Sequence, residues 1–210
     1  MRIPRRLPFV FLQMCCLSSL VLATAATNAS AAPVVRLSEI LAAPARDWDG
    51  SGLFSSRDDE WIEIVNGGAT SADLTPYFVT DGDSVPRFAF SGTLAPGAVL
   101  LVTGAMSVAW ERATAHPVFG LSLGNTGDKV LLWKITASDT ALVDEYAYKA
   151  HESAADRAVG RTPDGIDWKL EDQLNPYTGT VLPAGTGCAP TPGAANSCGV
   201  VSTHPTSWGR

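Results

Sequence analysis

The stretch Asp59-Glu60-Trp61-Ile62-Glu63-Ile64-Val65-Asn66 decides the fold. A period of two places Ile62 and Ile64 on one face of an extended strand, while Trp61, Glu63 and Val65 fall on the other. β-branched and aromatic residues in strict alternation favour a strand over a helix. This stretch therefore predicts a β-strand.

Similar short runs occupy most of the chain. Apolar or alternating segments lie at residues 34–41, 77–81, 87–90, 99–103, 129–135 and 141–148, with a later pair at 158–161 and 167–170. They are separated by turn-forming residues at 66–68, 96–97, 125–128 and 163–165, which tolerate positive φ or preset a bend. Only residues 106–115 have the composition of a short helix. This pattern predicts an all-β sandwich.

The first residues are typical of a secretory signal peptide. Arg2, Arg5 and Arg6 precede an apolar run over residues 9–26, and Ala29-Ser30-Ala31 supplies a small-residue cleavage site. We expect cleavage after Ala31, a secreted or periplasmic protein, a domain over residues 32–198 and a flexible tail over residues 199–210.

Three other interpretations of this segment were weighed. The apolar run is nearly long enough for a membrane anchor, but the cleavage site follows at the expected place. Lipidation at Cys15 or Cys16 is disfavoured because Met14 precedes Cys15 where a small residue is required. A twin-arginine signal at Arg5 and Arg6 is disfavoured by Pro8.

Removal of the signal makes the chain strongly acidic. The whole sequence has 15 basic and 21 acidic residues, and loss of three arginines changes the formal charge from −6 to −9. Such a surface repels phosphate backbones and anionic lipid, so we expect no nucleic-acid partner and no membrane insertion after cleavage. The sequence does not indicate an oligomeric state.

Two cysteines, Cys188 and Cys198, lie beyond the signal segment. An even number of cysteines in an exported chain predicts a disulfide between them. The loop that they close is short, so its expected stabilisation is about 2.5–3 kcal/mol.

The ordered motifs resemble the lamin-tail domain family, in its exported bacterial form. The resemblance begins with Val35-Arg36-Leu37-Ser38-Glu39-Ile40-Leu41 and the stretch quoted above. It continues through residues 74–81, 94–102, 121–128 and 161–165, and it ends with Thr191-Pro192-Gly193-Ala194-Ala195-Asn196. The motifs cover nearly the whole chain beyond the signal, in order.

This resemblance implies an immunoglobulin-like β-sandwich. It also implies an interaction or anchoring module, because bacterial members often accompany nucleases, phosphatases or surface proteins. The family has no catalytic residues to transfer. This chain departs from that pattern because no second domain accompanies the sandwich in the sequence.

Residues 47–58 are the best candidate for a metal-binding site. They match a twelve-residue calcium loop, with Asp47, Asp49 and Ser51 at positions 1, 3 and 5 and Asp58 at position 12. Closely spaced carboxylates on a turning loop supply the oxygen ligands that Ca²⁺ prefers. Asp58 is shorter than the usual Glu and no flanking helices are expected, so a solvated acidic loop is the alternative.

Two further patterns carry weaker expectations. Gly120-Leu121-Ser122-Leu123-Gly124 has the letters of a nucleophile elbow, but a turn and a strand follow instead of a helix, so we expect an ordinary strand end. Glu63, on the Trp61 face, is expected to pair with a buried arginine, and Arg161 is the candidate.

Two functions therefore remain open. The first is a non-catalytic binding or scaffolding module that contacts a protein or polysaccharide at the cell surface. The second is a secreted metal-dependent hydrolase, of phosphoesterase or nuclease type, that uses the acidic residues of loop 47–60 as ligands for two divalent ions. No cofactor is expected apart from Ca²⁺ in that loop.

Overall fold

The computed structural model describes residues 34–197. Strand β1 (Val35–Leu41) lies at the centre of a five-stranded sheet, between β2 (Trp61–Asn66) and β10 (Ala158–Arg161). Strands β7 (Val99–Thr103) and β11 (Trp168–Glu171) extend this sheet, whose order is β11-β10-β1-β2-β7. Every neighbouring pair in it is antiparallel.

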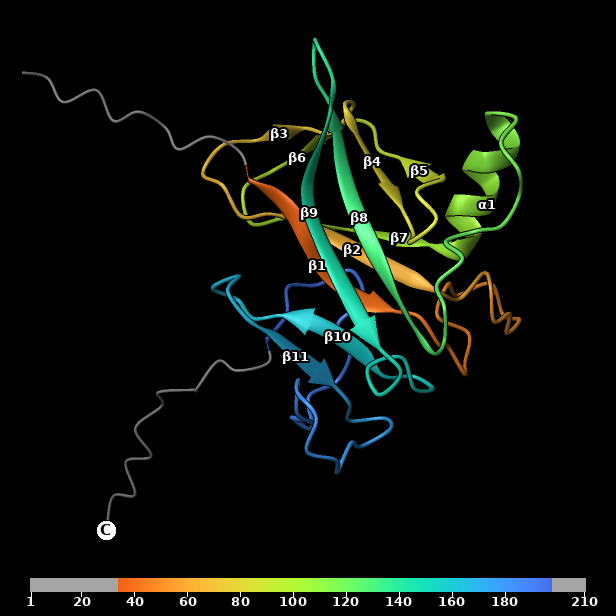
Figure 1. The fold of residues 1–210 in the computed structure, drawn as a ribbon, viewed down its shortest axis with the longest axis vertical. Helices are drawn as coiled ribbons and strands as arrows, with labels where there is room; N and C mark the ends of the chain where they lie inside the picture. Colours follow the sequence, from red (N-terminus) through yellow and green to blue (C-terminus); the bar gives the residue numbers. More distant parts are fainter. Residues whose placement is uncertain (1–33, 198–210) are drawn as a thin grey trace, which may run out of the picture.

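A four-stranded antiparallel sheet forms the second layer. Its order is β5-β4-β8-β9, and its members are β4 (Tyr77–Thr80), β5 (Pro86–Ala89), β8 (Gly127–Ile135) and β9 (Thr140–Lys149). In Figure 1, the long strands β8 and β9 cross over β1 and β2. A two-residue pair, β3 (Ala72–Asp73) with β6 (Thr93–Leu94), completes the strands. The predicted all-β sandwich is confirmed.

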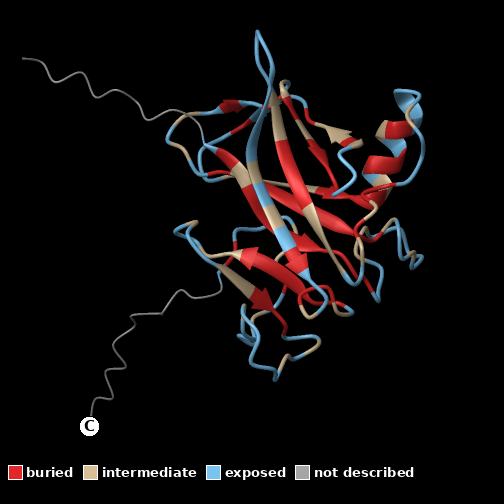
Figure 2. Ribbon diagram, viewed as in Figure 1, coloured by how far each residue is buried: buried red, intermediate tan, exposed pale blue. Residues whose placement is uncertain are grey.

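The main core lies between the two large sheets. Ile62 and Ile64 of β2 belong to it together with Val79 of β4 and Leu132 of β8, and all four are at most 1% exposed. Figure 2 shows the buried residues concentrated where the sheets face one another. The alternation predicted for β2 therefore places its isoleucines in the core.

The opposite, outer face of the five-stranded sheet is buried as well. Trp61 packs there with Leu41 and Ala158, and the Trp48 ring meets it edge-on at 6.0 Å. Burial on both faces explains why six of the seven residues of β1 are buried. It also means that polar side chains of the outer face must find partners within the protein.

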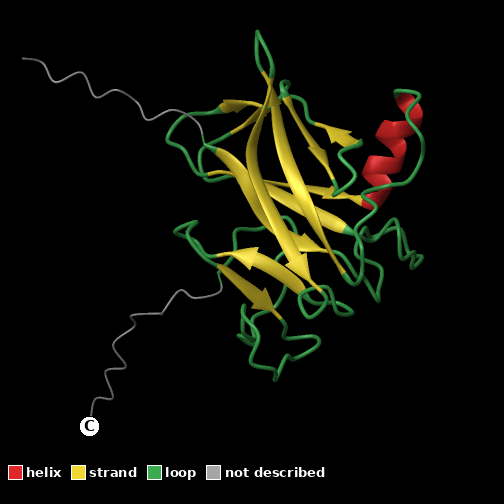
Figure 3. Cartoon of the chain, viewed as in Figure 1, coloured by secondary structure: helices red, strands yellow, loops and turns green. Residues whose placement is uncertain are grey.

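The helix α1 (Gly104–Ala113) starts two residues before the predicted segment. Thr103 caps it by accepting a hydrogen bond from the Met106 amide at 3.2 Å. Gly104 begins the helix because a Cβ there would lie 1.8 Å from the Arg57 carbonyl oxygen. The absence of a side chain at Gly104 thus allows the start of the helix to pack closely against Arg57. Figure 3 shows α1 beside the sheets.

The expected pairing of Glu63 with Arg161 is wrong. Glu63 lies opposite Glu39, and Glu39 lies opposite Gly160, so these three residues share the outer face. Arg161 is the next residue along β10 and therefore points to the other face. There its Nη2 pairs with Asp144 of β9 at 2.7 Å.

Several expectations fall outside the described residues. These are the signal segment 1–31, the tail 199–210 and Cys198, so the Cys188–Cys198 disulfide stays a prediction. Within residues 34–197, no helix has the length and apolar character needed to cross a bilayer.

Candidate functional site

The acidic loop that leads into β2 is organised around Asp59. This residue is fully buried, and its Oδ1 accepts hydrogen bonds from the amides of Trp48 at 2.6 Å and Asp49 at 2.9 Å. Its Oδ2 accepts from the Ser55 amide at 2.7 Å. One carboxylate therefore fixes both ends of the turn between residues 48 and 55.

Asp47 and Asp49 stabilise the tip of the same loop. Asp47 accepts hydrogen bonds from the amides of Gly50 at 2.8 Å and Gly52 at 2.7 Å. Asp49 accepts from the Ser51 amide at 2.8 Å, and the Ser51 hydroxyl donates to the Leu53 carbonyl at 3.1 Å. These contacts hold the carboxylates of the loop close to one another.

The structure brings together only part of the predicted calcium loop. Carboxylate oxygens of Asp47, Asp49 and Asp59 lie within 4.8 Å of one another. Asp58 is elsewhere: its Oδ1 accepts from the Arg57 Nε at 2.7 Å, and the Arg57 hydrogen bond lowers the pKa of Asp58. The position-12 acid of the loop pattern is thus replaced by its neighbour in sequence. Three carboxylates and nearby hydroxyl and carbonyl groups are ligands of the kind that suits Ca²⁺.

A second acidic group lies on the outer face of the five-stranded sheet, beneath the segment 191–196. Glu39 accepts hydrogen bonds from the Thr191 amide at 3.1 Å and the Thr191 hydroxyl at 2.6 Å. Glu63 accepts from the Gly193 amide. Glu171 of β11 is 1% exposed, and neither of its carboxyl oxygens has a partner among the described residues. Sequence analysis did not identify Glu39 or Glu171.

Burial shifts the protonation of all three glutamates. Loss of hydration raises the pKa of Glu39 to about 7, although its hydrogen bonds from Thr191 act in the opposite direction. Burial and the neighbouring Glu39 carboxyl raise the pKa of Glu63 to about 8 and that of Glu171 to about 9. The group therefore retains protons near neutral pH.

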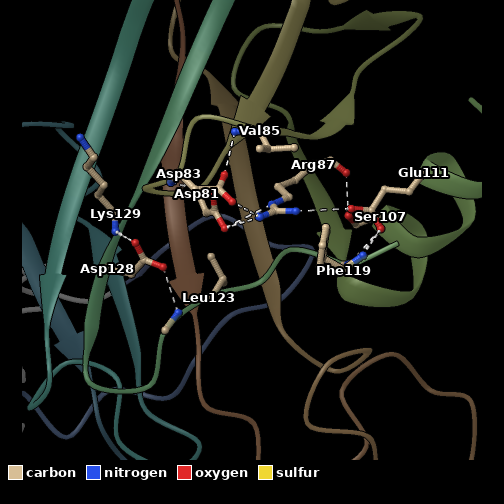
Figure 4. A network of polar contacts seen from close by, with 12 residues as sticks. Asp81, Asp83, Val85, Arg87, Ser107, Glu111, Phe119, Leu123, Asp128 and Lys129 are labelled. Atoms are coloured by element: carbon tan, nitrogen blue, oxygen red, sulfur yellow. Dashed lines mark hydrogen bonds and ion pairs between the residues drawn. The ribbon is translucent and has the colours of Figure 1, made fainter. Parts of the chain in front are cut away.

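A third polar network ties α1 to the four-stranded sheet. The guanidinium of Arg87, on β5, pairs with Asp81 at 2.8 Å and with Asp83 at 2.7 Å. Glu111 of α1 accepts from the Phe119 amide at 2.9 Å, and the Arg87 carbonyl accepts from the Ser107 hydroxyl at 2.6 Å. Figure 4 shows these side chains converging on the buried Arg87. Because each charge has a partner, the network is best understood as structural.

A surface groove of about 580 Å³ runs between β9, β11 and the loop 182–186. Stacked rings of Tyr146 and Trp168, with centroids 3.9 Å apart, line it. Lys149 and Lys169 add charge, and Leu182 at its edge is 72% exposed. The sequence analysis did not identify this pair. We call this feature the aromatic groove.

Residues 120–124, which match the sequence pattern of a nucleophile elbow, do not form one. Residues 120–124 lie in an irregular segment that ends at β8, and the Gly120 amide donates to Glu111 at 2.8 Å. A strand–turn–helix is required for an elbow, and here a strand follows. The expected strand end is therefore replaced by an irregular segment held by α1.

Comparison with known proteins identifies one family. The profile of the family described as Lamin Tail Domain matches residues 28–150. This region contains β1, β2 and β7 of the five-stranded sheet and all four strands of the second sheet. Strands β10 and β11 follow it. No curated protein matches the sequence.

Asp59→Asn tests the organisation of the loop. It replaces an oxygen that accepts from backbone amides by an NH₂ group, leaving buried donors unpaired, so we expect a loss of about 1–3 kcal/mol in the free energy of unfolding. Asp58→Asn is the matched control because it removes only a surface ion pair, which contributes about 0–1 kcal/mol. Denaturant unfolding of both variants measures this, and equal effects would contradict the assigned role of Asp59.

The three outer-face glutamates predict a pH dependence of stability. Their folded pKa values of about 7, 8 and 9 lie above the ordinary value of 4.5, so the folded state binds more protons than the unfolded state. Their contribution is complete below about pH 4.5 and is lost as the pH rises through 7–9. We expect the denaturant concentration at the unfolding midpoint to decrease as the pH is raised from 5.5 to 9.

Glu171→Gln should reduce the slope of that decline, because glutamine cannot ionise. The exposed Glu145→Gln, on β9, is the control and should leave the slope unchanged. A slope that is the same in the wild type and in Glu171→Gln would show that Glu171 ionises normally in the folded protein.

Proposed function

We propose that this chain, which belongs to the lamin-tail domain family, is an exported binding or scaffolding module that contacts a protein or a polysaccharide at the cell surface. The family match supports a non-enzymatic immunoglobulin-like domain. The signal-like sequence of residues 1–31 supports the proposed export to the periplasm or beyond.

The aromatic groove is the observation that carries the binding role. Apolar side chains cost free energy when they face water, and grouped exposure of this kind marks interaction sites. Leu182 is 72% exposed and the adjacent Val181 is 51% exposed, beside the stacked Tyr146 and Trp168. Two lysines and two acids, Glu152 and Asp167, also line the groove, which suits a polar partner surface.

A hydrolase is not proposed. The family supplies no catalytic residues, and among the described residues the acidic loop forms one group of three carboxylates, not the pair of metal sites that the hydrolase would need. Asp59 accepts from three amides, and Glu60 accepts from the Leu123 amide at 3.2 Å. These bonds support a structural role for the two residues.

The binding role is tested by capture of partners from the native envelope fraction on immobilised protein. Leu182→Asp should reduce capture about tenfold, because a charge replaces an exposed apolar side chain of the groove. Leu142→Asp is the control, since Leu142 on β9 is 45% exposed and lies outside the groove lining. Equal capture by the wild type and Leu182→Asp would contradict the role of the groove, and no capture by the wild type would contradict the function.

We also propose that the acidic loop binds Ca²⁺ through Asp47, Asp49 and Asp59, with Ser51 adjacent. Calorimetric titration should give a saturable heat with a Kd on the order of 10⁻⁴–10⁻³ M, the range of extracellular calcium modules. The double variant Asp47→Asn, Asp49→Asn should abolish the heat, whereas Asp58→Asn should retain it, because Asp58 pairs with Arg57. Absence of heat at millimolar Ca²⁺ would exclude the site.

A further inference from the structure

A second pocket, of about 330 Å³, lies at the end of the five-stranded sheet where β1 starts and β2 ends. Three turns and the end of the segment 191–196 enclose it. Its lining includes the side chains of Arg36, Ser38, Val65, Asn66, Thr162 and Asn196. We call it the Arg36 pocket. It is lined by different residues from the aromatic groove, so the two can be tested separately.

Arg36 is the distinctive group in this pocket. Its Nε is buried and has no hydrogen-bond partner among the described residues, and none of the ion pairs among residues 34–197 involves it. A buried guanidinium donor without an acceptor is costly, because it has lost its water without replacement. Because Nε is closed off, an acceptor from outside would have to bind Nη1 and Nη2, which have no hydrogen-bond partner among the described residues either.

The second arginine of the pocket is already occupied. Arg161 pairs with Asp144 through Nη2 at 2.7 Å and donates from Nε to the Leu37 carbonyl at 3.0 Å. The nearby main-chain amides are also in use: Gly67 donates to the Val34 carbonyl and Gly68 donates to the Asn66 side chain. Arg36 is thus the charged donor that remains available at this site.

Two glycines shape the pocket around the Arg36 guanidinium. A Cβ at Gly67 would lie 3.0 Å from Nη2, and a Cβ at Gly165 would lie 2.0 Å from Nη1. Gly165 also has φ +75, a conformation in which a side chain is strained. The two turns therefore hold the guanidinium closely, which reduces the entropy lost when it binds a ligand.

The nearest acid does not neutralise Arg36 by direct contact. Asp164 Oδ1 accepts from the Thr162 hydroxyl at 2.6 Å and from the Ile166 amide at 3.0 Å. The Thr162 hydrogen bond chiefly lowers the pKa of Asp164, and the charge of Arg36 contributes to the same shift. Arg36 therefore acts on Asp164 through space, and its donors remain free for a ligand.

We propose that the Arg36 pocket binds the carboxylate of an acidic sugar, such as a hexuronic acid unit. A planar guanidinium binds a carboxylate through two parallel hydrogen bonds. The volume lies at the lower end of small-ligand pockets, which suits one sugar ring. The Ser38 hydroxyl also lines the pocket and suits a hydroxyl group of such a ring, whereas the side chains of Thr162 and Asn196 are already hydrogen-bonded within the fold. This proposal goes beyond the binding function proposed above, because it assigns a second site, separate from the aromatic groove.

The test is an NMR titration that follows the Nε–Hε signal of Arg36 in protein labelled with ¹⁵N-arginine. D-glucuronate should shift this signal saturably, whereas D-glucose, which lacks the carboxylate, should not. Inorganic phosphate and N-acetylaspartate amide distinguish other anions. An equal or tighter response to either of them would overturn the acidic-sugar assignment, and no response to glucuronate would overturn the site.

Variants distinguish the effect of the Arg36 charge on binding from an effect on the fold. Arg36→Gln should weaken glucuronate binding about tenfold or more, because it removes both charge-assisted hydrogen bonds. Arg112→Gln is the matched control, since it removes an equal charge from an exposed position on α1. Gly67→Ala keeps the charge but crowds Nη2, so it should also weaken binding. It provides the test if Arg36→Gln does not fold; unchanged affinity in Gly67→Ala would then overturn the assignment.

The readouts also separate this proposal from the binding function proposed above. Glucuronate titration reports on the Arg36 pocket alone, whereas envelope capture by Leu182→Asp reports on the aromatic groove. A silent titration combined with groove-dependent capture would remove the Arg36 site and leave the binding function intact.

Discussion

The rest of the structure depends on the burial of both faces of β1 and β2. A sandwich needs only one buried face per sheet, and the other usually faces water. Here the segment 191–196 covers the outer face, where Glu39 and Glu63 lie directly opposite one another. Two carboxyl groups in that position repel when both are ionised, and burial strengthens the repulsion. Their hydrogen bonds to Thr191 and Gly193, and their raised pKa values, are the protein's response to this constraint.

The same constraint dictates small residues nearby. A Cβ at Gly160 would lie 2.6 Å from Glu171 Oε1 and 2.8 Å from Asn196 Nδ2, so a side chain at that position would displace the cover. Asn196 in turn donates to the carbonyls of Ser38 and Arg161, which belong to β1 and β10. One amide thus joins two strands to the last described segment of the chain. The segment 191–196 is therefore part of the fold and not an appendage.

Sequence reasoning identified the strands well because it depends on local alternation. The placement of the β2 isoleucines on one face and of Trp61 on the other follows from a period of two alone. It failed for β3 and β6, since strands of two residues have no periodicity. It also failed for the partner of Glu63, because the register that places Gly160 opposite Glu39 is a long-range property. A bulge between Leu37 and Glu39 further alters the count along β1.

The candidate sites were predicted less well than the fold, for a related reason. A calcium-loop pattern counts positions along the chain, and it selected Asp58 because that residue is twelfth. In the structure the buried carboxylate that lies near Asp47 and Asp49 is instead that of Asp59. The sequence marks Arg36 only as part of a family motif, because nothing in its local sequence distinguishes an unpaired arginine from a paired one. Its environment depends on Gly67 and Gly165, which are 98 residues apart in sequence and converge only after the sheet has formed. An unpaired donor such as Arg36 is therefore recognised only when the partners of each buried donor and acceptor are accounted for in the folded chain.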